Sequence, residues 1–430
     1  MTPWEVKCLR RDDRRPAPAT GCGLRPARSR EAVGLRWWGG RALLQGPGWC
    51  ARGEAGLSAE PCRARSLPER VAKLRWEGRC VPELRLDPVT GRWVVVATER
   101  AKRPKDFARQ DAASHQARPE RSETCPFCPG NESATPPEVF SFRRCGTRPN
   151  EPGWQVRGVP NKYPALTPEP TVEASTSGIF SVRPAVGAHE VIIESPLHNA
   201  SPATMSYEDM THVVRAYVHR YCALADAPGI EYVLIFRNHG RDAGASLEHP
   251  HSQIAAVPLV PPVVIEELAG ASRYYETTGR CVFCEMIRQE LEAGARVVLE
   301  TPGFIALEPY ASKMPFETWI LPKEHAPFFQ QLAPSTYREL AEVLVDVLGT
   351  IGAGLHDPPY NYILHTSPTH ERCGSSYHWH IEIFPKLTVA AGFEFGMGVY
   401  INVTTPESAA EFLRNQIERV RSGRNSGSQR

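Results

Sequence analysis

Apolar and polar residues alternate with a period of two along many short stretches of the chain, which is typical of strands in antiparallel sheets. Two longer stretches, residues 206–224 and 334–353, carry apolar side chains at the spacing of amphipathic helices. The pattern predicts a hairpin over residues 84–98 and strands at 156–160, 187–194, 232–236, 253–257, 296–300, 304–307, 317–322, 362–365 and 377–384. Residues 168–187 are rich in Thr, Pro and Ser and predict a surface excursion.

The same order of elements and of reactive side chains occurs twice along the chain. A C-x-x-C pair is followed by two histidines 51 residues apart in the first half (198 to 249) and 53 apart in the second (325 to 378). Matched spacing of this kind indicates an internal duplication. We therefore predict an α+β fold of tandem units, residues 81–262 and 263–430, with two mostly antiparallel sheets and packed helices.

The first 80 residues differ from the rest of the chain. They are rich in Arg, Gly, Ala, Pro and Trp and show no sustained helical or strand period. Such a segment buries too little apolar surface to offset its ordering entropy, and it lacks the apolar region of a secretory signal. We expect residues 1–80 to be disordered, or to be an extension that arises when the start codon is assigned too far upstream.

The charge balance argues against nucleic acid as a partner. Residues 1–79 hold 17 of the 50 Lys and Arg and 8 of the 48 Asp and Glu, so the remainder carries 33 against 40, a balance of −7. A net acidic body without a basic face does not favour binding to phosphate backbones. No stretch approaches the roughly 18–20 apolar residues that cross a membrane, so we expect no membrane partner.

The cysteine distribution favours metal ligands over structural disulfides. Twelve cysteines are few for a disulfide framework in 430 residues, and four of them form the two C-x-x-C pairs. This use of cysteine suits a reducing compartment, and we expect a cytoplasmic protein. Two Cys₂His₂ zinc sites are predicted, one formed by Cys125, Cys128, His198 and His249 and the other by Cys281, Cys284, His325 and His378. The histidines lie too far along the chain for a nucleic-acid-binding finger.

Residues 249–253 read His-Pro-His-Ser-Gln, and a strand would place His249, His251 and Gln253 on one face. If His249 is held by a metal, His251 is left as a nucleophile, because a neutral imidazole can attack phosphorus and form a covalent phosphoramidate. Gln253 can donate a hydrogen bond to a phosphoryl oxygen without titrating. This motif points to transfer of a phosphorus-containing group in two steps.

The residues just quoted, with Gly-Ala-Ser at 244–246 and Cys-Pro-Phe-Cys-Pro-Gly-Asn at 125–131, resemble galactose-1-phosphate uridylyltransferase of the histidine-triad superfamily. The resemblance covers about residues 82–415. It implies two histidine-triad-like units per protomer, a homodimer, zinc, and a ping-pong reaction through a uridylylated histidine. In that reaction UDP-glucose gives up UMP, glucose 1-phosphate is released, and galactose 1-phosphate takes the UMP.

The resemblance also implies roles for individual residues. His251 becomes the nucleophile and Gln253 a phosphate contact. Nucleotide-sugar and hexose-phosphate contacts fall on Arg100, Arg103, Asn161, Asn238 and Ser246. Guanidinium groups suit phosphate oxygens, although a solvated basic loop would also explain the two arginines.

Two regions depart from the family pattern. Some members carry a metal on one Glu and three His, for which His365, His378, His380 and Glu267 or Glu266 are candidates. We favour the Cys₂His₂ set with His378, because it repeats the first half. His380 and Glu382 then take the places of His251 and Gln253, and we assign no catalysis to His380. Residues 393–402 form a Gly-rich strand in place of the usual sugar-selecting segment.

Three alternatives to uridylyl transfer remain open at this point. The divergent segment 393–402 also fits an ADP-glucose phosphorylase-like activity, with AMP on the histidine. A histidine-triad nucleotide hydrolase would usually have a third His at the place of Gln253. A zinc-bound structural or nucleic-acid-binding protein would form no covalent adduct.

Overall fold

The computed structural model describes residues 82–102, 119–170, 172–370 and 374–427. The expected N-terminal extension, residues 1–80, and Arg103 lie outside these ranges. Among the described residues, no helix has both the length and the apolar character that a membrane crossing requires.

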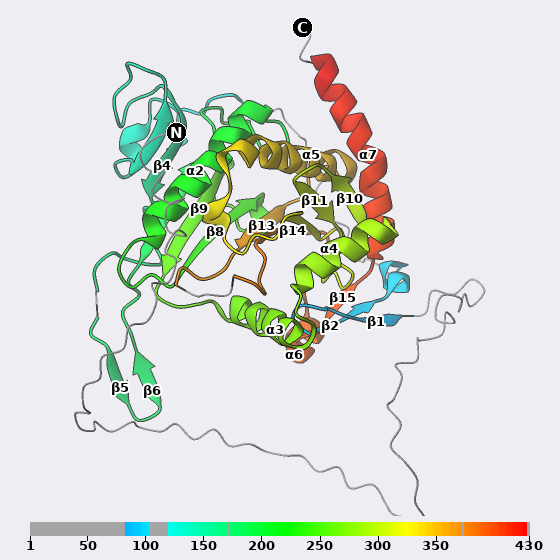
Figure 1. Ribbon diagram of the computed structural model, residues 1–430. Helices are drawn as coiled ribbons and strands as arrows, with labels where there is room; N and C mark the ends of the chain where they lie inside the picture. Colours follow the sequence, from blue (N-terminus) through cyan, green and yellow to red (C-terminus); the bar gives the residue numbers. More distant parts are fainter. Residues whose placement is uncertain (1–81, 103–118, 171, 371–373, 428–430) are drawn as a thin grey trace, which may run out of the picture. The chain divides into compact units, whose positions relative to one another are not determined.

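A ten-stranded antiparallel sheet dominates the described part of the chain (Figure 1). Its spatial order is β10-β11-β12-β14-β13-β8-β9-β7-β4-β3. The strands are β3 (Phe140–Arg143), β4 (Trp154–Pro160), β7 (Ala188–Ile193), β8 (Tyr232–His239), β9 (His251–Val257), β10 (Val297–Glu300), β11 (Phe304–Leu307), β12 (Thr318–Pro322), β13 (Tyr360–His365) and β14 (His380–Pro385). The α+β class is confirmed.

The strand order is symmetric about its centre. Counted outward, β8-β9-β7-β4-β3 in one half corresponds to β13-β14-β12-β11-β10 in the other. The structure therefore shows the duplication that the spacing of the histidines predicts. The two expected sheets are one sheet, because β8 and β13 pair antiparallel with Ile363 opposite Phe236. This pairing satisfies the backbone groups of two strands that would otherwise be exposed edges.

Two equivalent helices cover one face of the sheet. Helices α2 (Tyr207–Ala225) and α5 (Tyr337–Leu355) lie side by side in Figure 1 and pack against each other. In α2 the residues Met210, Val213, Val214 and Tyr217 are buried, which is the spacing of one helical face. Helix α7 (Pro406–Gly427) packs on α5. The main hydrophobic core lies between these helices and the sheet.

The opposite face of the sheet is covered differently in the two halves. In the C-terminal half, helices α3 (Pro262–Thr278) and α4 (Val282–Ala293) bury a second core that includes Leu307 and Trp319. In the N-terminal half, a small cluster around Trp154 and Val191 packs against Phe127 on the same face. The N-terminal half thus keeps an opening above β9.

A second sheet joins the two ends of the described chain. Strands β1 (Glu83–Leu86) and β2 (Trp93–Val96) form the predicted hairpin, and β15 (Tyr400–Asn402) pairs parallel with β2. The predicted Gly-rich strand over residues 393–402 is wrong for most of its length. Helix α6 (Gly392–Met397) occupies this segment, because the Glu394 carboxylate accepts the Ala391 N–H at 2.8 Å and Gly398 ends the helix at φ 66°.

The segment predicted as a surface excursion forms a small hairpin of β5 (Ser175–Ser177) and β6 (Phe180–Val182). All six of its strand residues are exposed, which confirms the prediction.

Candidate active site

His251 begins strand β9 and lies on the open face of the N-terminal half. Its side chain is 6% exposed, and its Nδ1–H donates to the backbone carbonyl of His249 at 2.8 Å. Burial lowers the pKa of this imidazole, so the ring is neutral near pH 7. With Nδ1 protonated, Nε2 keeps its lone pair, and this atom is the candidate nucleophile.

The backbone around His251 is held by a buried ion pair. Arg237 on β8 pairs with Glu194, and its guanidinium also donates to the carbonyl oxygen of His251 at 3.1 Å. Both side chains are almost fully buried. A charged donor and an antiparallel ladder on each side of β9 leave the first residue of this strand little freedom.

A pocket of about 440 Å³ opens beside His251. Its walls are mainly apolar, and its few polar side chains include Asn161, Ser246 and Gln253. An apolar cleft of this size with a few converging polar groups is typical of a small-molecule site. The apolar lining residues include Pro126, Phe127, Pro136, Val159, Val191 and Leu247.

A second, more polar pocket of about 370 Å³ shares Ser246 and Leu247 with the first. Asn238 and Arg241 line it. Asn361 Nδ2 donates to the side-chain oxygen of Asn238, Oδ1, at 2.8 Å. This contact leaves the side-chain N–H groups of Asn238 available as donors. Two adjoining pockets, one apolar and one polar, suit a ligand with a ring at one end and charged or hydroxylated groups at the other.

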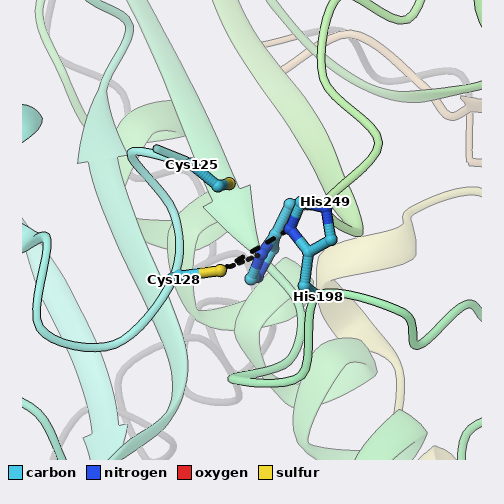
Figure 2. Close-up of side chains that lie close together, drawn as sticks. All are labelled: Cys125, Cys128, His198 and His249. Atoms are coloured by element: carbon cyan, nitrogen blue, oxygen red, sulfur yellow. Dashed lines mark hydrogen bonds between the residues drawn. The ribbon is translucent and has the colours of Figure 1, made fainter. Parts of the chain in front are cut away.

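Cys125, Cys128, His198 and His249 come together as predicted (Figure 2). The Cys128 sulfur lies 3.5 Å from His198 Nδ1 and 3.6 Å from His249 Nδ1. Zn–S and Zn–N bonds of about 2.3 and 2.05 Å in a tetrahedron place S and N about 3.5 Å apart. The His249 Nε2–H donates to Ser195 O at 2.8 Å, so its Nδ1 lone pair faces the sulfurs.

The titration of these groups fits a metal site. Burial lowers the pKa of His249 to about 4, which keeps its imidazole neutral and able to ligate. Burial raises the pKa of the Cys125 thiol to about 11, so its thiolate needs a neighbouring cation at neutral pH. A divalent metal with a preference for sulfur and nitrogen supplies that charge.

The second predicted cluster repeats this geometry. Cys281 and Cys284 lie beside His325 and His378, with the Cys284 sulfur 3.3 and 3.7 Å from the two Nδ1 atoms. The remaining nitrogens donate to backbone carbonyls, His325 to Gly374 at 2.7 Å and His378 to Pro322 at 2.8 Å. The same donor set recurs in both halves, and His378 has the same tautomer as His249.

Among the described residues, the other candidate ligands form a separate group. Glu267, His365, His380 and Glu382 lie close together, without His378. Both Glu267 oxygens already accept hydrogen bonds, at 2.9 Å from His365 Nδ1 and at 2.6 Å from the Tyr377 hydroxyl. The structure thus separates the two metal sets that competed for His378 in the sequence.

His380 occupies the place of His251 but is closed off from solvent. It is 0% exposed, with the Trp319 ring stacked on it at 4.9 Å and Phe283 at 5.2 Å between centroids. Trp319 pairs with Glu382 across the strands, whereas Val191 pairs with Gln253 in the first half. A Trp therefore fills the space that a smaller Val leaves open beside His251.

The structure places Arg100 in a different pocket from His251. It lines a small pocket with Lys313, Glu394 and Tyr400, and this pocket shares no residue with the one at His251. Arg103 lies outside the described residues. Within one chain, His251, Gln253, Asn161 and Ser246 meet, Asn238 adjoins them, and Arg100 does not.

Sequence reasoning missed His189 on strand β7. Its Nε2 lies 2.8 Å from Gln253 Oε1. The period of two in residues 187–194 placed His189 and Val191 on one face. Only the strand pairing reveals that this face adjoins Gln253.

Paired histidines beside a pocket in a duplicated α+β sheet, with two Cys₂His₂ clusters, are the arrangement expected of a nucleotidyl-transferring enzyme. The N-terminal domain model of galactose-1-phosphate uridyl transferase matches residues 73–261, and the C-terminal domain model of the same enzyme matches residues 267–420. The chain belongs to the galactose-1-phosphate uridyl transferase family, and the resemblance seen in the sequence is confirmed.

Individual relatives fall into two kinds. An ADP-glucose phosphorylase of Arabidopsis thaliana is 37% identical over 77% of this chain and 92% of its own length. A galactose-1-phosphate uridylyltransferase of Thermotoga maritima is 30% identical over 77% and 98%.

Solved structures divide in the same way. An Arabidopsis thaliana ADP-glucose phosphorylase with bound ADP-glucose superposes with a TM-score of 0.66 at 38% identity, over 78% of this chain and 99% of that one. A uridylyltransferase superposes with a TM-score of 0.61 at 30% identity, over the same shares of the two chains.

We predict that the purified chain holds two metal ions, and that Cys128→Ser removes one of them and destabilises the fold by on the order of 2–4 kcal/mol, because metal binding is coupled to folding. Elemental analysis of the purified chain and a urea melt measure both effects. Cys145→Ser, at an exposed free cysteine, is the matched control and should keep two metals. Two metals per chain in Cys128→Ser would show that the first cluster is misassigned.

Proposed function

We propose that the chain transfers a nucleoside monophosphate from a nucleoside diphosphate glucose to a phosphorylated acceptor through a covalent nucleotidyl-His251. The observation that carries this is the free Nε2 of His251 at the edge of a nucleotide-sized pocket, with Nδ1–H fixed on its own backbone. UDP-glucose is the proposed donor. Galactose 1-phosphate is the proposed acceptor, since the Thermotoga maritima relative is named a galactose-1-phosphate uridylyltransferase.

The first step forms one bond and breaks one. Nε2 of His251 attacks the α-phosphorus, a P–N bond forms, and the bond from this phosphorus to the bridging oxygen breaks. Glucose 1-phosphate leaves with that electron pair. In the second step a phosphate oxygen of the acceptor attacks the same phosphorus, and the P–N bond returns its electrons to Nε2. Two displacements of this kind give ping-pong kinetics.

Neutral hydrogen-bond donors around His251, two amides and a hydroxyl, would stabilise the charge that develops on the phosphoryl oxygens. The Gln253 carboxamide lies two residues along the same strand face, and Asn238 with Ser246 borders the polar pocket. Such donors stabilise a transition state without adding a proton that must be moved. We assign the base to the apolar pocket lined by Phe127 and Asn161.

We assign zinc to both Cys₂His₂ clusters, because tetrahedral sulfur and nitrogen donors suit this ion. Bound zinc would cross-link the 125–128 loop to the His249 end of the nucleotide-binding strand. His249 would thus be structural, and the chemistry would be left to His251. Thiolate ligands favour a reducing compartment, so we propose that the enzyme acts in the cytoplasm.

ADP-glucose is a second candidate donor, with AMP on His251. The specific observation is the similarity to the ADP-glucose phosphorylase of Arabidopsis thaliana, at 37% identity in sequence and at 38% in its ADP-glucose-bound structure. The acceptor would then be inorganic phosphate. The chemistry at His251 is the same for both donors, and the apolar pocket decides between them.

We predict a mass gain equal to UMP or to AMP when the zinc-loaded protein is mixed with UDP-glucose or ADP-glucose without acceptor. Intact-mass spectrometry measures the adduct, and the donor that gives it identifies the base. His251→Gly should show no gain with either donor and should lose at least ~10³-fold in turnover. A mass gain in His251→Gly equal to that of the wild type would refute the assignment of the nucleophile.

We further propose a homodimer in which Arg100 of one copy reaches the pocket of the other. Within one chain Arg100 lines a pocket apart from His251. The same region carries apolar side chains without cover, with Val389 82%, Phe395 80% and Met397 63% exposed. Exposed apolar groups of this kind mark interaction surfaces. A second copy would cover them and complete the phosphate-binding set.

We predict that Arg100→Ala and His251→Gly chains, each nearly inactive, regain about a quarter of the wild-type activity when co-expressed in equal amounts. Half of the dimers would be mixed, and each mixed dimer would hold one intact site of two. The control pair is His251→Gly with Gln253→Ala, whose defects share one pocket and should not complement. Absence of any regain with Arg100→Ala would show that Arg100 does not act across a dimer.

A further inference from the structure

His189 contacts Gln253 across two neighbouring strands. In the ladder of β7 and β9, Val191 lies opposite Gln253 and His189 lies opposite Ala255, so the His189 and Gln253 side chains are diagonal neighbours on one face. His189 Nε2 and Gln253 Oε1 are 2.8 Å apart. Gln253 lines the pocket at His251, whereas His189 stands behind it.

The backbone determines which ring nitrogen of His189 carries the proton. The Ala165 N–H donates to His189 Nδ1 at 3.1 Å, and a backbone amide can only donate. Nδ1 is therefore the acceptor, and the neutral ring carries its proton on Nε2. That N–H donates to Gln253 Oε1.

Asn161 acts on the same oxygen in the same sense. Its Oδ1 accepts the Tyr163 N–H at 2.9 Å, so its amide nitrogen must point the other way. This Nδ2 lies 3.4 Å from Gln253 Oε1. Two donors, each oriented by a backbone N–H, thus converge on the Gln253 carbonyl.

The orientation of the Gln253 carboxamide follows from these contacts. With Oε1 held by His189 and Asn161, the amide N–H groups are left for the pocket in which the phosphoryl group is attacked. A carboxamide turned by 180° would place its N–H groups against two donors and its oxygen against phosphoryl oxygens. Both arrangements are repulsive.

The second unit lacks this arrangement. Glu317 takes the place of His189, and it accepts hydrogen bonds from the Lys313 backbone N–H and from Trp319 Nε1 at 3.0 Å. The counterpart of Gln253 there is a carboxylate, Glu382, which offers no amide donor. The His-to-Gln contact is thus confined to the half with the open pocket.

We infer that His189 is a positioning residue that holds the Gln253 carboxamide with its N–H groups toward the transferred phosphoryl group. This inference rests on the proposed transfer through His251. His189 would not contact the substrate, and it would act only through Gln253.

The test is a double-mutant cycle on the single-turnover rate of adduct formation. The donor is whichever of UDP-glucose and ADP-glucose labels the wild type, and intact mass is recorded after rapid quenching. His189→Leu, with His189→Phe as a second loss variant, should slow labelling by about tenfold, the effect of one hydrogen bond. The donor concentration at half-maximal rate should change little. His189→Gln keeps a donor at the Nε2 position and should recover most of the rate.

The cycle separates positioning from a general structural role. In a Gln253→Ala background, His189→Leu should cause no further loss, because the group it orients is gone. His212→Leu, at a part-buried histidine on α2, is the matched control and should label at the wild-type rate. Metal content and melting temperature confirm that each variant is folded.

Several results would overturn the inference. A wild-type labelling rate in both His189→Leu and His189→Phe would do so, as would losses that multiply in the double variant, or a His189→Gln as slow as His189→Leu. Those outcomes leave the proposed function intact. A wild type that gains no mass from either donor would overturn the proposed function, and this inference with it.

Discussion

Hydrogen bonds from ring nitrogens to backbone carbonyls orient the imidazoles on which the rest of the site depends. His249 donates from Nε2 to Ser195 and turns Nδ1 toward two cysteines. His251 donates from Nδ1 to His249 and keeps Nε2 free toward the pocket. His249, just before β9, and His251, its first residue, thus direct opposite ring nitrogens toward the cysteines and toward the pocket. Neither ring has to gain or lose a proton for this arrangement, because burial keeps both rings neutral.

Duplication provided two such units, and packing separates their roles. The second unit repeats the cysteines, the histidines and the carbonyl contacts, so its ring geometry is almost the same. Helices α3 and α4 bury that face, and Trp319 covers His380. In the first unit the corresponding residue is Val191, and a pocket remains. The difference between the proposed nucleophile, His251, which borders a pocket, and its enclosed counterpart, His380, is therefore steric. A metal on each unit would hold both loops in place, whichever unit reacts.

Local patterns in the sequence predicted most of the strands and the residues of both clusters. The 51- and 53-residue histidine spacings predicted the duplication. The C-x-x-C pairs predicted the candidate metal sites, because their two cysteines are close in sequence. The prediction of two separate sheets failed, because sheet pairing depends on contacts between strands that are distant in sequence. Nothing local tells that β8 pairs with β13 and merges two sheets into one. The helix at residues 392–397 was missed because residues 393–402 were interpreted as a Gly-rich strand. The Glu394 cap favours a helix there.

The candidate site shows the same division. His251, Gln253, His249, His378 and the C-x-x-C cysteines could be found from motifs that lie within a few residues. His198 and His325 could be found only from their matched spacing to the second histidine of each half. His189 could not, since its role depends on the β7–β9 register. Arg100 was grouped with the nucleotide by resemblance, yet one chain places it in another pocket. Positions of that kind depend on the fold, and for Arg100 we propose that they depend also on an assembly of two copies.

We propose that His251 of the duplicated pair reacts and that its counterpart, His380, does not. The most direct measurement is the location of the adduct by fragmentation of peptides at alkaline pH, where a phosphoramidate survives. We expect a nucleotidyl group on His251 and none on His380, in protein treated with the donor that labels it. A modified His380, or a modified peptide that lacks His251, would contradict this proposal.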